Sequence, residues 1–150
     1  MKKEKKRIIL DASFLINLLN SKLSAHENAV GFYREFLNRK SEFLLSAINM
    51  AEYLVKGDID DLPLRNIRLI DYAIEDALIT ADLHRKIGVK NRYPREVAKD
   101  DLKVIAQAVN YNCSVILTAD SDFEKYIREV DFEIEIINIS KTNYTEYFNN

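Results

Sequence analysis

The stretch SVILTADSDF, residues 114–123, joins a short apolar run to a group of acidic residues. Residues 115–117 are β-branched or aliphatic, which predicts a strand buried on both faces, and a helical pattern follows over 123–130. Asp120 and Asp122 would then stand at the carboxyl end of a parallel strand, where open α/β sheets bind their ligands. A simpler interpretation is that Asp120 or Ser121 is only the N-cap of the following helix and that Asp122 lies in its first turn, where the helix dipole favours an acid. On this stretch alone the capping interpretation is favoured, so the choice depends on the rest of the chain.

The composition is that of a globular protein with one core. The chain has 150 residues, of which 47% are hydrophobic and 31% are charged, with only 3 Gly and 2 Pro. This length favours a single domain over residues 1–150. No apolar run reaches the roughly 18 residues that a membrane span needs, and Asp11 and Asn17 interrupt the apolar N-terminal part, which argues against a signal peptide. The single Cys113 cannot form an internal disulfide, so a cytoplasmic location is expected.

Short apolar runs alternate with helical patterns along the chain. The predicted strands are residues 7–10, 43–45, 66–70, 114–118 and 134–139. The predicted helices are a segment capped by Ser13 and residues 26–40, 46–57, 73–87, 96–112 and 123–130. This alternation predicts a three-layer α/β/α sandwich around a central parallel sheet of about five strands, joined by right-handed crossovers. The polar tail with interleaved aromatics, residues 140–150, is expected to be a short packed segment or a contact between copies.

Three acids are expected near one edge of this sheet. Asp11 and Asp120 each follow a predicted strand, so they lie at the same edge and face one crevice if their strands are neighbours. Asp101 falls near the inward face of helix 96–112, whereas Asp100 points elsewhere and is expected in solvent.

Glu52 is a fourth candidate. It lies at the edge of the buried stripe of helix 46–57, where an acid exposed only to solvent is less natural. Such a residue is most often paired with a neighbouring lysine, here Lys56 at i+4. Otherwise Glu52 joins the other three acids.

Clustered carboxylates repel one another, and the usual resolution is a hard divalent cation. Carboxylate oxygens suit Mg²⁺ or Mn²⁺, and there is no set of Cys or His residues that would argue for zinc. Such ions activate water and neutralise the oxygens of a phosphodiester. Ser13 and Thr118 are positioned to hydrogen-bond the carboxylates. Because 24 of the 150 residues are acidic, each acid alone is weak evidence, and a metal site stays a hypothesis at this point.

The basic residues have two interpretations. A net charge of -2 excludes a generally basic nucleic-acid binder. Two local clusters nevertheless stand out, and either is a solvated face or a set of phosphate contacts. The first is Lys2, Lys3, Lys5, Lys6 and Arg7. The second is Lys86, Lys90, Arg92, Arg95, Lys99 and Lys103, which surrounds the acidic pair at 100–101.

Taken in order, four motifs resemble those of the PIN-domain ribonucleases along nearly the whole chain. IILDASFLINLL looks like the opening strand and helix of that family, and SAINMAEYL is similar to its second motif. DLKVIAQAV and VILTADSDF resemble the third and fourth motifs. The chain length suits the VapC toxin subgroup. The residues that match the family's functional positions are Asp11, Ser13, Glu52, Asp101, Thr118, Asp120 and Asp122.

The resemblance implies a compact α/β/α sandwich and Mg²⁺- or Mn²⁺-dependent cleavage of single-stranded RNA or RNA loops. It implies that Asp11, Asp101 and Asp120 hold the metal, that Glu52 binds it or orients the attacking water, and that Asp122 assists. In toxin members it also implies a homodimer that is held inactive by an antitoxin encoded alongside.

The sequence departs from the family pattern at two places. Asn49 stands in the second motif where many members carry a hydroxyl residue, and the adjacent Asp100 and Asp101 leave the register of the third ligand open by one residue. Two other functions also stay open. One is a PIN-type nuclease in ribosomal RNA maturation or RNA quality control, although such members often carry a zinc ribbon and this chain has one Cys. The other is a non-catalytic α/β module that binds nucleic acid or protein and whose acids are only helix caps.

Overall fold

A computed structural model describes residues 5–88, 95–129 and 132–149 of the chain. Its centre is a five-stranded sheet in which every neighbouring pair is parallel, with the strand order β3-β2-β1-β4-β5. The strands are β1 (Arg7–Leu10), β2 (Glu42–Ser46), β3 (Ile67–Ile70), β4 (Val115–Thr118) and β5 (Glu135–Asn138). Each predicted strand is present to within one residue at either end. The predicted α/β/α sandwich with a central parallel sheet is confirmed.

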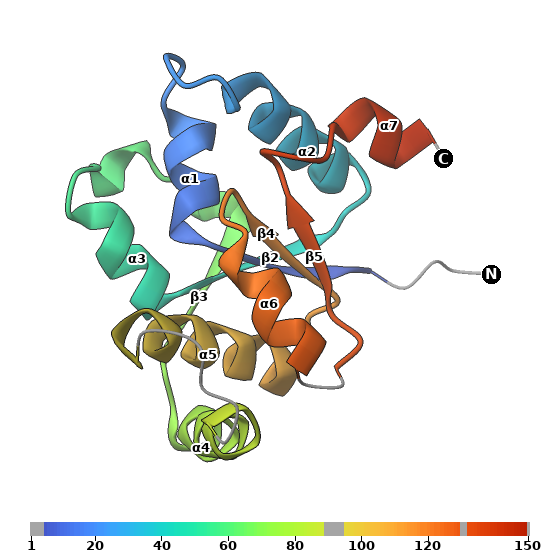
Figure 1. Cartoon of the computed structure of the whole chain (residues 1–150). Helices are drawn as coiled ribbons and strands as arrows, with labels where there is room; N and C mark the ends of the chain where they lie inside the picture. Colours follow the sequence, from blue (N-terminus) through green and yellow to red (C-terminus); the bar gives the residue numbers. More distant parts are fainter. Residues whose placement is uncertain (1–4, 89–94, 130–131, 150) are drawn as a thin grey trace.

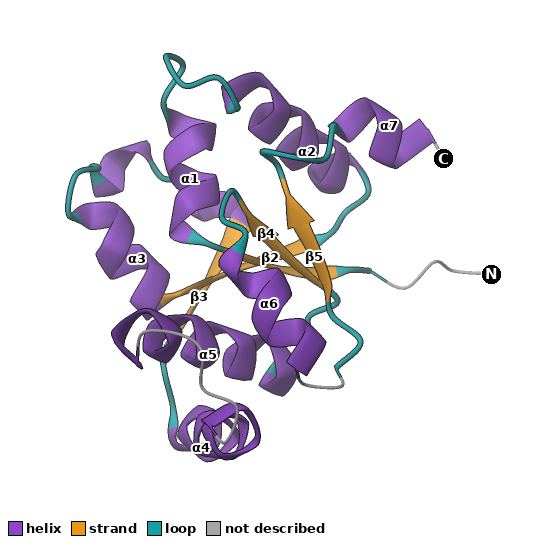
Figure 2. Cartoon of the chain, viewed as in Figure 1, coloured by secondary structure: helices purple, strands orange, loops and turns teal. Residues whose placement is uncertain are grey.

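Helices cover both faces of the sheet, as Figure 2 shows. They are α1 (Ala12–Leu19), α2 (His26–Asn38), α3 (Ala47–Leu54), α4 (Ile74–Gly88), α5 (Arg95–Asn110), α6 (Asp122–Glu129) and α7 (Tyr144–Asn149), with two short 3-10 turns at Ile59–Asp61 and Leu64–Asn66. α3 ends at Leu54, three residues before the predicted end, and the Gly57 amide closes a turn beyond it by donating to the Tyr53 carbonyl. None of the helices in the described ranges has the length and apolar character that crossing a membrane requires.

Two cores lie on opposite faces of the sheet because successive side chains of a strand point in opposite directions. Ile8 and Leu10 of β1 pack with α1, α2 and α7, whereas Ile9 packs with α4, α5 and α6. All three of these side chains are fully buried. The apolar runs that predicted the strands are therefore apolar on both sides, as expected for a parallel sheet covered by two helical layers.

The strand order places a topological switch point between β1 and β4. From β1 the chain proceeds to β2 and β3 on one side, then crosses to β4 and β5 on the other side (Figure 1). The amide of Asp11 donates to the carbonyl of Leu117 at 2.9 Å, which continues the β1–β4 pairing to the carboxyl ends of both strands. Loops that leave a sheet in opposite directions from such a point form the crevice where ligands bind.

The C-terminal tail forms α7, which packs on α2 through aromatic rings. Tyr144, Tyr147 and Phe148 of α7 contact Phe32 and Phe36 of α2, with ring centroids 5.0–6.4 Å apart. Within this chain the tail is therefore a packed segment.

Gly31→Ala is expected to lower the free energy of unfolding, because a methyl group at Gly31 of α2 would overlap the ring of Tyr144. Such overpacking costs about 1–3 kcal/mol, which exceeds the roughly 1 kcal/mol that Ala gains over Gly inside a helix. Urea denaturation measures the difference. In a Tyr144→Ala background the same substitution should instead be stabilising, and destabilisation of equal size in both backgrounds would contradict the proposed overlap.

Candidate active site

Asp11 lies directly after β1, at the carboxyl edge of the sheet beside the switch point. Its side chain is only 6% exposed, and its Oδ2 accepts hydrogen bonds from Ser13 Oγ at 2.5 Å and Thr118 Oγ1 at 2.9 Å. The prediction that Ser13 caps the helix is wrong. α1 begins at Ala12, so Asp11 holds the N-cap position, and the Ser13 hydroxyl turns to Asp11 from within the first turn. Both hydroxyl residues of the family pattern, Ser13 and Thr118, therefore hydrogen-bond the Asp11 carboxylate.

The same two hydroxyls hold the loop between β4 and α6. Ser13 Oγ accepts the amide of Ala119 at 2.9 Å, and Thr118 Oγ1 accepts the amide of Asp120 at 2.9 Å. Each hydroxyl therefore donates to Asp11 and accepts from the loop that carries Asp120. This network ties the two strand-end acids together across the switch point.

Asp120 and Asp122 have different surroundings. The Asp120 carboxylate is exposed, and its Oδ1 accepts the amide of Asp122 at 3.0 Å, the first residue of α6. Asp122 is half-buried and its Oδ1 lies 3.5 Å from the Lys125 ammonium. Asp120 thus makes the capping contact that the simpler interpretation assigned to this stretch, while it also stands beside Asp11.

The structure separates Asp101 from Asp100. Asp101 on α5 is half-buried, whereas Asp100 is exposed and lies 3.7 Å from the Lys103 ammonium. Burial raises the pKa of Asp101 most, and the negative charges of Asp11, Asp120, Asp122 and Glu52 raise it further, to about 8. The side chain of Asp101 therefore shares one electrostatic environment with the other four acids.

Glu52 reaches the same environment from α3. Within the described part of the chain it makes no ion pair with Lys56, the partner expected at i+4. Much of the side chain is exposed, yet partial burial of the carboxylate raises its pKa, and the charges of Asp11 and Asp100 raise it further. Burial likewise raises the pKa of Asp11, against the two hydroxyl hydrogen bonds that lower it.

Asn49 has a role that sequence reasoning missed. Its side chain is buried, and Nδ2 donates to the carbonyl of Leu10 at 3.0 Å. This contact fixes the start of α3, and with it Glu52, against the end of β1. The departure from a hydroxyl residue at this position was the available signal, because a buried amide needs a specific partner.

The donor set fits a hard divalent cation in its chemistry. Carboxylate oxygens and hydroxyl groups are the ligands and supports that Mg²⁺ or Mn²⁺ prefers. As they stand, however, no three Asp, Glu, His or Cys side chains among the described residues converge closely enough to hold an ion.

The basic residues of the second cluster are only partly within the described structure. Lys86 on α4 forms an ion pair with Asp82 at 2.9 Å, and Lys103 pairs with Asp100 and lies 5.6 Å from the Tyr72 ring centroid. Lys90 and Arg92 lie outside the described residues, and for Arg95 and Lys99 only the backbone within α5 is described. Phosphate contacts by this cluster stay a prediction.

The first basic cluster lies elsewhere. Lys5 and Lys6 precede β1, so they stand at the amino edge of the parallel sheet, opposite the acids. Lys2 and Lys3 lie outside the described residues.

Known proteins with a similar fold were found among solved structures. Among curated protein sequences there is no match. Among solved structures, the chain is similar to VapBC2 from Rickettsia felis, solved with a DNA fragment from its promoter (17% identity, TM-score 0.64, 88% of this chain and 98% of that chain covered). It is also similar to FitAcB from Neisseria gonorrhoeae (16%, 0.67, 90% and 99%). A third is VapC20 from Mycobacterium tuberculosis, a toxin that cleaves the sarcin-ricin loop (15%, 0.59, 85% and 98%).

At these identities the structural similarity shows only that the fold is shared. The sequence shows the family, because residues 8–129 match the PIN domain family. This range contains all five candidate acids, the whole of β2, β3 and β4, and β1 except its first residue. The chain belongs to the PIN domain family, with a VapC-like fold.

Proposed function

We propose that this protein is a divalent-metal-dependent endoribonuclease and the toxin of a type II toxin–antitoxin pair. The observation that carries the proposal is the placement of Asp11, Glu52, Asp101 and Asp120 within one electrostatic environment beside the switch point, where burial and mutual repulsion raise the pKa of three of them. Like charges held together without compensation destabilise a fold. A site of this kind is expected where the charges serve a bound cation.

In this proposal Asp11, Asp101 and Asp120 hold Mg²⁺ or Mn²⁺. When bound, such an ion supplies an activated water and neutralises phosphodiester oxygens. Glu52 binds the ion or orients the water, and Asp122 supports the site from the first turn of α6. Ser13 and Thr118 orient the Asp11 carboxylate through the hydrogen bonds to Oδ2.

Purified protein is expected to cut structured RNA, transfer RNA included, at internal positions only when Mg²⁺ or Mn²⁺ is present. EDTA should stop the cleavage and excess metal should restore it, because the carboxylates alone cannot neutralise the phosphodiester. Gel analysis of end-labelled RNA measures this. Cleavage that persists in EDTA, or a folded protein that metal neither activates nor stabilises, would favour the non-catalytic binding module.

The antitoxin part of the proposal rests on the similarity to VapBC and FitAcB assemblies and on one apolar groove. Ile16 and Leu19 of α1 and Tyr53 of α3 form the apolar part of a groove of about 310 Å³, which Asn20, Lys56, Gly57 and Asp61 also line. Leu54, Val55 and Ile59 in the adjoining segment are also exposed, Val55 at 79%. Contiguous exposed apolar side chains mark binding surfaces.

An antitoxin with an apolar segment suits this groove, and an antitoxin-like gene directly upstream would support it. Without such a gene, a role in ribosomal RNA maturation or RNA quality control becomes the better proposal.

The cytoplasm is the proposed location of the protein. The proposed homodimer is tested by measuring the mass of the purified protein in solution.

A further inference from the structure

A basic cleft lies at the amino edge of the sheet, opposite the acids. Lys5 before β1, Lys40 after α2, and Arg65 and Arg68 around the start of β3 line it, and its volume is about 430 Å³. Glu42 is the one acid among its described lining residues. Four cations therefore surround one anion, in a chain whose net charge is -2. Sequence reasoning found only Lys5, because Lys40 and the pair Arg65 and Arg68 come from two further segments of the chain.

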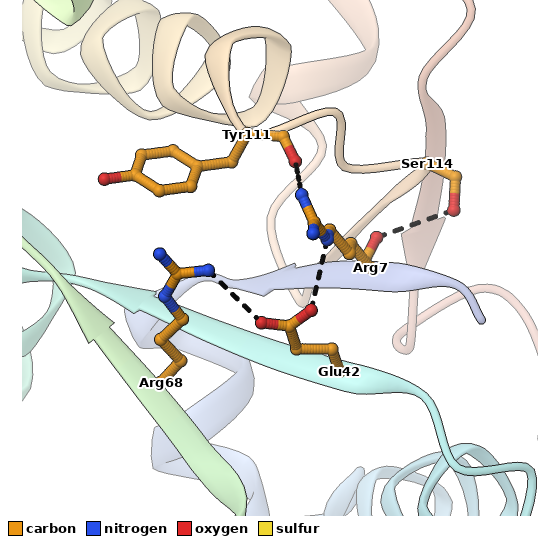
Figure 3. Close-up of polar contacts among 5 residues, drawn as sticks. All are labelled: Arg7, Glu42, Arg68, Tyr111 and Ser114. Atoms are coloured by element: carbon orange, nitrogen blue, oxygen red, sulfur yellow. Dashed lines mark hydrogen bonds and ion pairs between the residues drawn. The ribbon is translucent and has the colours of Figure 1, made fainter.

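The charge of Glu42 is already compensated, as Figure 3 shows. Its Oε2 lies 3.1 Å from Arg7 Nε and its Oε1 lies 3.4 Å from Arg68 Nη1. Arg7 also donates to the carbonyl of Tyr111 at 2.9 Å, and the Arg68 guanidinium lies 5.4 Å from the Tyr111 ring centroid. These contacts hold Arg68 in place, which lowers the entropic cost of using its remaining N–H groups for a ligand.

The other three cations have no such internal role. Lys5, Lys40 and Arg65 are exposed, and in the part of the chain that the structure describes none of them pairs with a carboxylate. The Lys40 backbone has a φ of 59°, a conformation that non-glycine residues seldom adopt. Ammonium and guanidinium groups gathered without counter-charge repel one another and attract a polyanion.

The lining of the cleft favours phosphate groups over a protein partner. Its two apolar residues, Phe43 and Ile67, are 0% and 6% exposed, so the accessible surface is polar and cationic. The centres of protein interfaces are depleted of charged residues, lysine in particular. Interfaces with nucleic acid are more polar and much more positively charged.

We propose that this basic cleft binds the sugar–phosphate backbone of the RNA substrate at a point remote from the cleaved bond. This inference rests on the proposed nuclease function and names the substrate class as structured RNA. Strands of four residues separate the two sheet edges by roughly 13 Å. A substrate that reaches both the acids and the cleft therefore has to be folded or several nucleotides long.

The test is the binding of a labelled RNA hairpin in EDTA, measured by fluorescence anisotropy across a series of salt concentrations. The double variant Lys5→Ala/Arg65→Ala removes two cations that lack internal partners, so the fold should persist. Binding is expected to weaken about tenfold near physiological salt, and the salt slope should fall by about one for each lost phosphate contact. Lys22→Ala/Arg34→Ala, which removes the same charge from other exposed positions, should bind like the wild type.

Unchanged affinity and salt slope in the Lys5/Arg65 variant would overturn the proposal. So would displacement of the RNA by polyglutamate at equal charge concentration, because an acidic protein would then be the better ligand. Charge reversal with Arg65→Glu should weaken binding further if the contact is real. Cleavage of a short single-stranded RNA in Mg²⁺ keeps the two proposals apart, since it reports on the acids alone and should be the same in the wild type and the double variant.

Discussion

Asp101→Asn is expected to lower the rate of metal-dependent RNA cleavage by about 10²- to 10⁴-fold, the range for loss of a group that acts at the reacting atoms. The Asp101 carboxyl shares the electrostatic environment of Asp11, Asp120 and Glu52, and an amide has no negative charge with which to hold a cation. Because Asn has almost the same size and shape, the packing of α5 should not change. Initial rates on one RNA at saturating Mg²⁺ measure the effect.

Asp100→Asn is the matched control, since it makes the same chemical change one residue earlier. Asp100 is exposed and its described ion pair is with Lys103 on the same helix. Exposed pairs of this kind contribute little to stability, so the variant should cleave at close to the wild-type rate. A large loss in Asp100→Asn with normal activity in Asp101→Asn would place the third metal ligand at Asp100 instead.

The metal-free protein is expected to become less stable as the pH rises from 3.8 toward about 8, the unfolded and folded pKa values of Asp101. In this window the folded state binds a proton at Asp101 that the unfolded state does not. The stabilisation is therefore complete below the unfolded pKa and is lost as the pH passes the folded pKa, by at most about 1.4 kcal/mol per pH unit for one group. The raised pKa values of Asp11 and Glu52 act in the same direction.

Urea unfolding in EDTA over this pH range measures the slope, and two comparisons identify its source. Asp101→Asn should flatten the slope and should be more stable than the wild type at neutral pH without metal. Saturating Mg²⁺ or Mn²⁺ should narrow that difference, because a ligand at 100 times its dissociation constant stabilises the folded wild type by about 2.7 kcal/mol. Equal slopes in the wild type and in Asp101→Asn would show that another group causes the pH dependence.

Local patterns predicted the sheet accurately because its strands are short, apolar on both faces and bounded by polar residues. Residues 115–117 read as a doubly buried strand, and Ile116 and Leu117 are fully buried. The helix ends were predicted less well, since hydrogen bonds set them rather than periodicity. Ser13 was taken as a cap from its residue type, but α1 already begins at Ala12, so Ser13 lies inside the first turn and its Oγ accepts the amide of Ala119 instead.

The candidate site likewise has a part that local sequence patterns predicted and a part that they did not. Asp11 and Asp120 were predicted to lie together because both follow strands, and parallel strands bring their carboxyl ends to one edge. Periodicity predicted that Asp101 turns inward on α5 and that Asp100 does not, and Asp101 is the more buried of the two. How near Asp101 comes to the other acids depends instead on how α5 packs against the sheet. The hydrogen bond from Asn49 to Leu10 joins residues 39 positions apart, so no local pattern contains it.

The sequence by itself determined the layer architecture, the parallel sheet and the set of acids, because these follow from residue type and spacing along each segment. Only the tertiary structure decided how the acids at 114–123 are used. Asp120 caps α6 and also stands beside Asp11, held there by Ser13 and Thr118. The tertiary structure also brought Lys40, Arg65 and Arg68 beside Lys5 in the basic cleft. The burial of a side chain, its pKa and the lining of a cleft depend on contacts between segments that are far apart in the sequence. The pattern of residues within one segment does not determine those contacts.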